Sequence, residues 1–348
     1  MKRKIHRRWV GWVMFIVLIL LLGGFNSAMG VIKIRVSICN SMLHPQGVGM
    51  SVFKKIVEKE TNGEVQVQIY PSSVLGGERE SIEQVQRKSI EMATASAGPL
   101  TLFNKKIYVM DIPFAFDDYY TAWMVMDSPI AEELWKSFEK EAGLKVLGIM
   151  ENGFRQITNR IRPIYTPDDL KGIKIRVMEA PMHIANFREL GANPTPIPWP
   201  ELYMTLQQKI VDGQENPITN IWETKMYEVQ KYVSLTKHIY DAMPLCANLE
   251  WFNNLPAEYQ VILEKAGSVA TNVSRFVNAA REDSLIPMLE AKGLEVNTLT
   301  EEQIDAFRQK SQAKVIELIK KEIGDPEFVD RWMKAIEEAR DYIKCGLE

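Results

Sequence analysis

The stretch KGIKIRVMEAPMHIANFRELGANPTPIPWPELYMTLQQKIVDGQENPITN, residues 171–220, decides how the rest of the chain is organised. It begins with a short predicted strand in which Ile173, Ile175 and Val177 alternate with charged residues. Because successive side chains of a strand point to opposite faces, Arg176 must point away from the apolar face. We therefore expect its guanidinium to be free at the end of the strand.

An arginine in this position has two interpretations. The ordinary one is a solvated surface charge or a structural ion pair. The loop that follows favours a binding role, because alternating prolines fix the backbone on both sides of Trp199. These prolines are Pro194, Pro196, Pro198 and Pro200. A rigid loop that presents one indole suggests the wall of a site, and a buried core tryptophan is the alternative.

Several segments of the chain match a known family in order and spacing. Within the opening stretch they are RVMEAP, GANPTPIPW, the E-x-Y-x-x-L-Q of residues 201–207, and VDGQENP. Elsewhere they are YPSS with LGGER at 70–79, FRQITN at 154–159 and YEVQKY at 227–232. Together these segments resemble the extracytoplasmic solute receptors of tripartite ATP-independent periplasmic (TRAP) transporters, the DctP-type solute-binding proteins. The resemblance implies a two-lobed α/β fold, a ligand cleft between the lobes and delivery of the ligand to a membrane permease.

The resemblance also implies which residues contact the ligand. Arg176 stands at the position of the family's clamp arginine, Arg155 at that of its second arginine, and Asn216 at that of the asparagine in its Q-E-N-P turn. Trp199 stands where the family usually has an aromatic residue that packs on the ligand's carbon skeleton. Geometry agrees for Arg176, because a guanidinium offers two parallel N–H donors that match the two oxygens of a carboxylate.

Three further candidates lie where predicted strands end or helices begin. The alternation of strands and helices predicts a mostly parallel sheet with ligand groups at the carboxyl ends of its strands. Asn40, Glu78 and Ser96 fall at such ends. For Glu78, an acid in the first turn of a helix that complements the helix dipole is an equal alternative.

The ligand class is narrowed by residues 96–99, which are small. The sialic-acid-binding branch of the family has a glutamate and an arginine in that region, so we do not expect sialic acid. Glu78 lies where an acidic residue often meets ligand hydroxyls. A sugar acid, such as a uronate or aldonate, is therefore favoured, and a C4-dicarboxylate or a 2-oxo acid is the alternative.

The length of 348 residues predicts two α/β domains. We expect domain I at residues 31–152 plus 242–281, and domain II, which includes long helices, at 153–241 plus 282–348. Two strands, at 233–240 and 245–251, are expected to cross between the domains. Pro287 is expected to kink or break a long helix, because proline removes a hydrogen-bond donor and crowds the preceding turn.

The N-terminus reads as a secretory signal peptide at residues 1–30. Five basic residues precede an uncharged apolar run at 9–25, and Ala28-Met29-Gly30 has the small residues of a cleavage site. We expect cleavage after Gly30 and a periplasmic protein. The alternative is an uncleaved anchor, because the run approaches the ~20 residues that cross a bilayer. A tethered protein of that kind would suit a ligand sensor.

Composition and motifs exclude several other functions. Without the five leader charges, 37 Lys and Arg residues stand against 45 Asp and Glu residues, which makes nucleic acid an improbable partner. The four histidines lack metal-ligand spacing, and no catalytic fingerprint is present. We expect neither enzyme activity nor a metal nor a cofactor, and we expect a monomer. Cys39, Cys246 and Cys345 are expected to be buried free thiols, and one disulfide is the open alternative.

Overall fold

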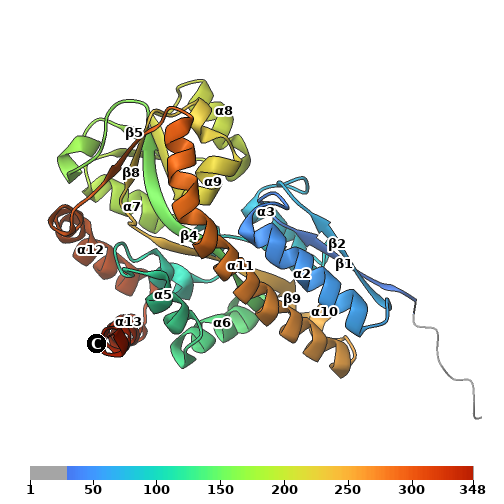
Figure 1. The fold of residues 1–348 in the computed structure, drawn as a ribbon. Coiled ribbons are helices and arrows are strands. Elements are labelled where there is room, and N and C mark those ends of the chain that lie inside the picture. Colours follow the sequence, from blue (N-terminus) through green and yellow to red (C-terminus); the bar gives the residue numbers. More distant parts are fainter. Residues whose placement is uncertain (1–29, 348) are drawn as a thin grey trace, which may run out of the picture.

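The computed structural model describes residues 30–347. The predicted signal peptide therefore lies outside the described residues, except for Gly30. Within the described part, no helix combines the length and apolar character that a membrane crossing requires. The fold is mixed α/β, with helices covering both faces of a large twisted sheet (Figure 1).

Ten strands make up the sheet within these residues. Their bounds are β1 Ile32–Ser37, β2 Val65–Tyr70, β3 Met92–Thr94, β4 Leu144–Asn159, β5 Lys174–Val177, β6 Asn193–Pro196, β7 Gly213–Pro217, β8 Tyr232–Leu235, β9 Tyr240–Asn248 and β10 Glu295–Thr298. The main path runs β2-β1-β3-β9-β4-β7-β5-β6, while β8 pairs with both β4 and β10. The order β2-β1-β3 is parallel, as the alternation of strands and helices predicts.

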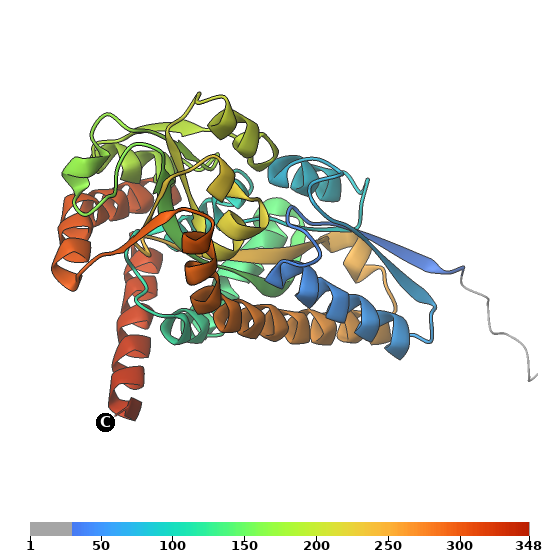
Figure 2. The same cartoon turned by 45° about the horizontal axis from the view of Figure 1, so that its top comes forward.

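Twelve helices accompany the sheet in the described part of the chain. They are α2 Pro45–Glu60, α3 Glu78–Gln86, α4 Ala97–Leu100, α5 Tyr119–Met126, α6 Pro129–Ala142, α7 Pro181–Glu189, α8 Leu202–Gln207, α9 Ile218–Glu223, α10 Leu249–Asn253, α11 Ala257–Ala291, α12 Glu301–Ile323 and α13 Pro326–Leu347. Short 3-10 turns lie at Lys105–Asp111, Pro167–Leu170, Trp199–Glu201 and Met226–Glu228. Figure 2 shows α13 projecting away from the rest of the molecule.

Strand β4 joins the two halves of the sheet. Its first part pairs antiparallel with β9, from Leu144 opposite Asn248 to Phe154 opposite Tyr240. Its last part pairs with β7, beginning at Arg155 opposite Pro217. One continuous strand therefore carries residues of both halves, and helices from both halves pack around it.

The pairing of β4 with β9 is irregular at Asn152. Glu151 lies opposite Ala242, and Gly153 lies opposite Asp241, so Asn152 is an extra residue on β4. Gly153 has a φ of 118°, a backbone conformation that side chains other than hydrogen rarely allow. This is a β-bulge, which bends a strand and changes the direction of the side chain at that point. The predicted domain boundary after residue 152 falls at this bulge; the division into two domains itself stays a prediction.

Two predicted features of the later chain are wrong in detail. The strand expected at 245–251 belongs to β9, which begins at Tyr240 and ends at Asn248. Helix α10 then begins because the Asn248 side chain accepts the backbone N–H of Trp251 at 2.9 Å. The strand expected at 233–240 is β8, which begins at Tyr232 and ends at Leu235.

Helix α11 runs through Pro287 without a break, so of the two predicted outcomes, a kink or a break, the break is wrong. The side chains of Leu285 and Leu289 on either side are buried in one apolar cluster with Val233 and Ile218, and this packing holds the last turns. The helix bends along its length, so that its first part lies beside α2 and its last part beside α9 (Figures 1 and 2).

Gly267 lets α11 approach β4 closely. A Cβ added there would lie 2.0 Å from the carbonyl oxygen of Leu147, a backbone atom that cannot move aside on its own. At an exposed position inside a helix, Gly→Ala stabilises the folded protein by about 1 kcal/mol. Here overpacking reverses the sign, so we expect Gly267→Ala to lower the free energy of unfolding by roughly 1–3 kcal/mol in urea denaturation.

The control is the next residue, Ser268, which is exposed on the same helix. We expect Ser268→Ala to leave stability within about 0.5 kcal/mol of the wild type. A Gly267→Ala variant as stable as the wild type would contradict the close contact between α11 and β4.

Candidate ligand-binding site

The predicted site residues converge on one small cavity. It has a volume of about 10 Å³, near the size that a single water molecule needs. It is lined by Cys39, Asn40, Glu78, Ser96, Asn152, Arg176, Met178, Trp199, Asn216, Asn220 and Met243. Six of the seven predicted site residues are in this set, and Arg155 is the exception. The lining therefore draws residues from both halves of the sheet, from Asn40 after β1 to Arg176 on β5.

A larger cleft adjoins this cavity. Its volume is about 420 Å³, within the range of small-molecule sites. Both spaces are lined by Glu78, Arg176, Met178 and Trp199. The cleft is also lined by the turn before α3 and by the proline-rich loop around Trp199. The polar groups of the inner cavity thus lie at the inner end of a space large enough for a small organic acid.

Arg176 is a buried cation without an anionic partner in the described structure. Its side chain comes from the third residue of β5 and is 2% exposed. Nε donates to the carbonyl oxygen of Ile197 at 2.8 Å, whereas Nη1 has no hydrogen-bond partner among the described residues. Burial lowers its pKa to about 10, and the more distant carboxylate of Glu215 opposes that shift. Arg176 is still charged at neutral pH.

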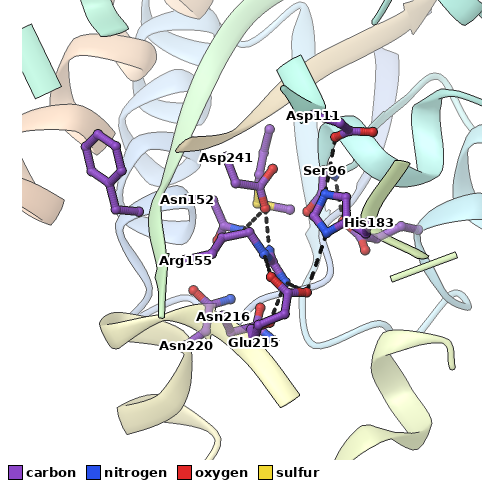
Figure 3. A network of polar contacts seen from close by, with 12 residues as sticks. Ser96, Asp111, Asn152, Arg155, His183, Glu215, Asn216, Asn220 and Asp241 are labelled. Carbon is purple, nitrogen blue, oxygen red and sulfur yellow. Dashed lines mark hydrogen bonds and ion pairs between the residues drawn. The ribbon is translucent and has the colours of Figure 1, made fainter. Parts of the chain in front are cut away.

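Arg155, in contrast, is neutralised within the protein. Its Nε and Nη2 bind the Glu215 carboxylate, with 2.8 Å between Nη2 and Oε1, and its Nη1 donates to Asp241 Oδ2 at 2.6 Å (Figure 3). Nη2 also donates to the Glu215 carbonyl. These donors all face protein groups, and contact of Arg155 with a ligand stays a prediction.

Glu215 is the centre of a buried network that sequence reasoning missed. Besides Arg155, its carboxylate accepts from His238 Nε2 at 3.1 Å and lies 3.6 Å from His183 Nδ1. His183 Nε2 lies 3.3 Å from Asp111 (Figure 3). Burial alone would lower the pKa of His183, but Asp111 and Glu215 raise it to about 9. Arg155, His183 and His238 in turn hold the pKa of Glu215 well below its usual value despite burial.

Glu78 combines the two roles that its sequence position allows. It is the first residue of α3, and it lines the cavity while only 8% exposed. The backbone N–H of Ser96 donates to Oε1 at 2.6 Å, and Cys39 Sγ lies 3.8 Å from the same oxygen. Burial raises the pKa of Glu78, and the Ser96 N–H and the charge of Arg176 oppose that shift. The same residue therefore begins helix α3 and forms part of the cavity wall.

Amide side chains form the other wall of the cavity. Asn216 Nδ2 donates to Gln214 Oε1 at 2.5 Å within β7. Asn220 Nδ2 lies 3.5 Å from Asn40 Oδ1. His44 Nε2 lies 3.2 Å from the Asn220 oxygen. These groups offer both donors and acceptors to a polar molecule.

Trp199 stands where the proline-rich loop predicts a wall. Its indole is half-buried and packs against two apolar clusters, one centred on β1 and β2 and one on α8 and α9. It also lines both the cavity and the cleft. The alternatives of wall and core are thus not exclusive.

The remaining expectations concern metals and thiols. No group of three or more His, Cys, Asp and Glu side chains in the described structure could hold a metal ion. Cys39 and Cys246 are buried free thiols, as expected. Cys345 is free but exposed, contrary to the expectation, because it lies at the end of the projecting helix α13.

The chain matches the family of bacterial extracellular solute-binding proteins, family 7, over residues 36–322. It belongs to this family. The chain is similar to the 2,3-diketo-L-gulonate-binding periplasmic protein YiaO of Escherichia coli, to which it is 32% identical over 90% of this chain and 94% of that protein. The C4-dicarboxylate-binding periplasmic protein DctP of Vibrio cholerae is 33% identical over 83% of this chain and 90% of that protein.

Solved structures of family 7 proteins share this fold. The sugar acid binding protein DctPAm of Advenella mimigardefordensis, in complex with galactonate, matches with a TM-score of 0.85 at 31% identity, over 89% of this chain and 99% of that one. Family 7 proteins are periplasmic receptors with two lobes, and they act in transport with membrane permease subunits rather than as enzymes. The chain is therefore a TRAP-type solute-binding protein for small organic acids, as the sequence resemblance predicts.

The buried network makes the stability of this receptor depend on pH. The pKa of His183 is raised from 6.5 to about 9, so the folded state binds a proton that the unfolded state has lost in this window. The stabilisation is complete below pH 6.5 and lost as pH rises to 9. We expect the free energy of unfolding to fall over this range, and to fall less in His183→Gln, as measured by urea denaturation at a series of pH values.

Glu151 also titrates in part of the pH range over which His183 loses its proton. Burial raises its pKa from 4.5 to about 8, so its contribution to the free energy of unfolding decreases as the pH rises from 4.5 to 8. The interval from pH 8 to 9 therefore separates the two residues. Equal slopes for wild type and His183→Gln in that interval would show that His183 is not held protonated by Asp111 and Glu215.

Proposed function

We propose that the protein captures a small organic acid in the cleft between its lobes, through a clamp made by Arg176, and delivers it to the membrane permease of a TRAP transporter. The observation that carries this proposal is the buried Arg176 guanidinium, whose Nη1 has no partner among the described residues. A ligand carboxylate would supply both the missing charge and the missing acceptors. Arg155, Asn216, Trp199, Glu78, Asn40 and Ser96 complete the proposed contact set.

A sugar acid, such as an aldonate or uronate, is the favoured ligand class. The lining of amides and Glu78 supports it, because such groups hydrogen-bond hydroxyls. The YiaO and DctPAm relatives, named for a diketogulonate and a sugar acid, support it as well. The alternative is a C4-dicarboxylate, which the Vibrio cholerae relative favours, or a 2-oxo acid.

We further propose that the leader is cleaved after Gly30 and that the mature protein is a periplasmic monomer. Family membership supports the periplasmic location. N-terminal sequencing of the secreted protein tests the cleavage, and retention of residues 1–30 would favour a membrane-tethered receptor. Light scattering tests the monomer.

The clamp is tested by replacing Arg176. We expect Arg176→Met to abolish binding of every acid in a thermal-shift screen of aldonates, uronates, C4-dicarboxylates and 2-oxo acids. Wild type with a ligand at ~100 times its dissociation constant should gain roughly 2.7 kcal/mol. Arg176→Lys keeps the charge but loses the bidentate geometry, so we expect weak residual binding.

The same variant distinguishes a binding role from a structural one. If Arg176 serves the ligand, removing a buried unpaired charge relieves a desolvation cost that exceeds the single bond to Ile197. We therefore expect ligand-free Arg176→Met to be more stable than wild type by roughly 1–3 kcal/mol. A less stable variant that still binds acids would contradict the proposal.

Closure of the lobes is supported by contacts on the edge of the site. Ser41 Oγ donates to the Glu223 carboxylate, and His44 pairs with Asn220. Ser41 and His44 precede α2, whereas Asn220 and Glu223 belong to α9. In the proposed division, these contacts join domain I to domain II. They would form only when the lobes meet.

We expect Glu223→Ala to accelerate ligand dissociation about 2- to 10-fold, because the closed state loses a hydrogen bond although Glu223 does not line the cavity. Stopped-flow fluorescence with a ligand found in the screen measures this rate. Glu132→Ala, which removes an exposed carboxylate paired with Lys136 within α6, is the control and should leave the rate unchanged. An unchanged rate in both variants would rule out a closing role for the Ser41–Glu223 contact.

A further inference from the structure

Asn152 is the residue that the bulge in β4 turns toward the cavity. It has no partner in the pairing with β9, because Glu151 and Gly153 lie opposite the consecutive residues Ala242 and Asp241. Its side chain is 2% exposed and lines the same cavity as Arg176. An extra residue at a bulge next to a binding site commonly serves to aim its side chain.

The orientation of the Asn152 amide is fixed by its neighbour. Nδ2 donates to Asp241 Oδ2 at 2.8 Å, and the same oxygen accepts from Arg155 Nη1 at 2.6 Å (Figure 3). A carboxylate oxygen can only accept, so the amide must present its NH₂ group there. The amide oxygen Oδ1 is consequently directed elsewhere, and it has no hydrogen-bond partner within residues 30–347.

Two residues that line this cavity therefore each carry a buried polar atom without a partner in the described structure. Several other buried side chains of the described structure also have an atom without a partner, but of that group Asn152 and Arg176 alone line the cavity. Arg176 Nη1 is a charged donor, and Asn152 Oδ1 is a neutral acceptor. Leaving either atom unsatisfied in a closed site is costly. A ligand that satisfies both must carry an anionic acceptor and a separate hydrogen-bond donor.

This requirement separates sugar acids from C4-dicarboxylates that carry no hydroxyl group. At neutral pH, succinate has two carboxylates and no donor, so it can satisfy Arg176 but not Asn152. Its second carboxylate would also meet Glu78, which lines the cavity. An aldonate or uronate has one carboxylate and several hydroxyl donors.

We propose that Asn152 is a specificity-determining residue, whose amide oxygen accepts a hydrogen bond from a ligand hydroxyl and so selects hydroxylated acids over unsubstituted dicarboxylates. This inference rests on the proposed function, because it assigns a contact within the Arg176 site. A site built to bind a hydroxyl rejects an analogue that lacks it, because its own buried group is then left unpaired.

The test is isothermal titration calorimetry with galactonate, its monodeoxy analogues and succinate. For wild type, we expect galactonate to bind at least ten times more tightly than succinate, and one monodeoxy analogue to lose about 10- to 100-fold in affinity. In Asn152→Ala, galactonate should weaken by a similar factor, and succinate should not weaken. The penalty for that one deoxy analogue should vanish in the variant.

Asn186→Ala is the matched control. Asn186 is fully buried and does not line the cavity. Both polar atoms of its side chain lack a partner in the described structure, whereas Asn152 lacks one for Oδ1 alone. We expect this variant to keep the wild-type order of affinities. The analogue series on wild type needs no variant, so it decides the question even if Asn152→Ala folds poorly.

The outcomes separate this inference from the proposed function. Binding of acids with equal affinity for galactonate and all its deoxy analogues would overturn the role of Asn152 and leave the receptor function in place. The same holds if succinate binds more tightly than galactonate, or if Asn152→Ala weakens both acids equally. Failure of a folded wild-type protein to bind any acid of the wider screen would overturn both.

Discussion

A guanidinium that is buried without a carboxylate is the constraint on which the site depends. Charged groups lose several kcal/mol of hydration when they are buried, and proteins usually recover this by pairing them. Arg155 follows that rule, because Glu215 and Asp241 surround it. Arg176 does not, because Glu215 is already engaged by Arg155 and the two histidines. The fold thus holds one cation neutralised and its neighbour ready for an anion from outside.

The rest of the architecture supports this difference. Strand β4 carries Asn152 and Arg155 within four positions, so a single stretch of backbone fixes the Asp241 interactions of both. Strand β5 places Arg176 beside β7, which supplies Glu215 and Asn216. The loop around Trp199 then closes the outer side. Asp241 on β9, Glu78 on α3 and the two histidines, which come from other segments, complete the charge balance of the site.

Local patterns in the sequence predict the parts of the site that depend on local structure. The alternation around residues 173–177 gives the direction of Arg176, and the prolines around Trp199 give a rigid wall. Glu78 and Ser96 follow from the starts of helices after strands. The error at residues 245–251 has a local cause as well, because the Asn248 cap starts α10 where the strand was expected to continue. The absence of a break at Pro287 depends instead on packing of Leu285 and Leu289 against distant residues.

Contacts between distant segments could not be predicted in this way. His183, Asp111 and Glu215 come from three separate elements, and nothing in their spacing links them. Asn152 was missed because a bulge interrupts the alternation on which strand prediction relies. Its only local signal is the glycine that follows, which permits a positive φ.

The distribution of the three thiols has a practical consequence. Burial raises the pKa of Cys39 and Cys246, which makes both poor nucleophiles, whereas Cys345 is exposed near the tip of α13. Alkylating reagents will therefore attach at one point, remote from the cleft. A fluorophore or spin label can be placed there on the natural chain, and in an oxidising solution the same thiol will link two molecules tail to tail unless it is blocked.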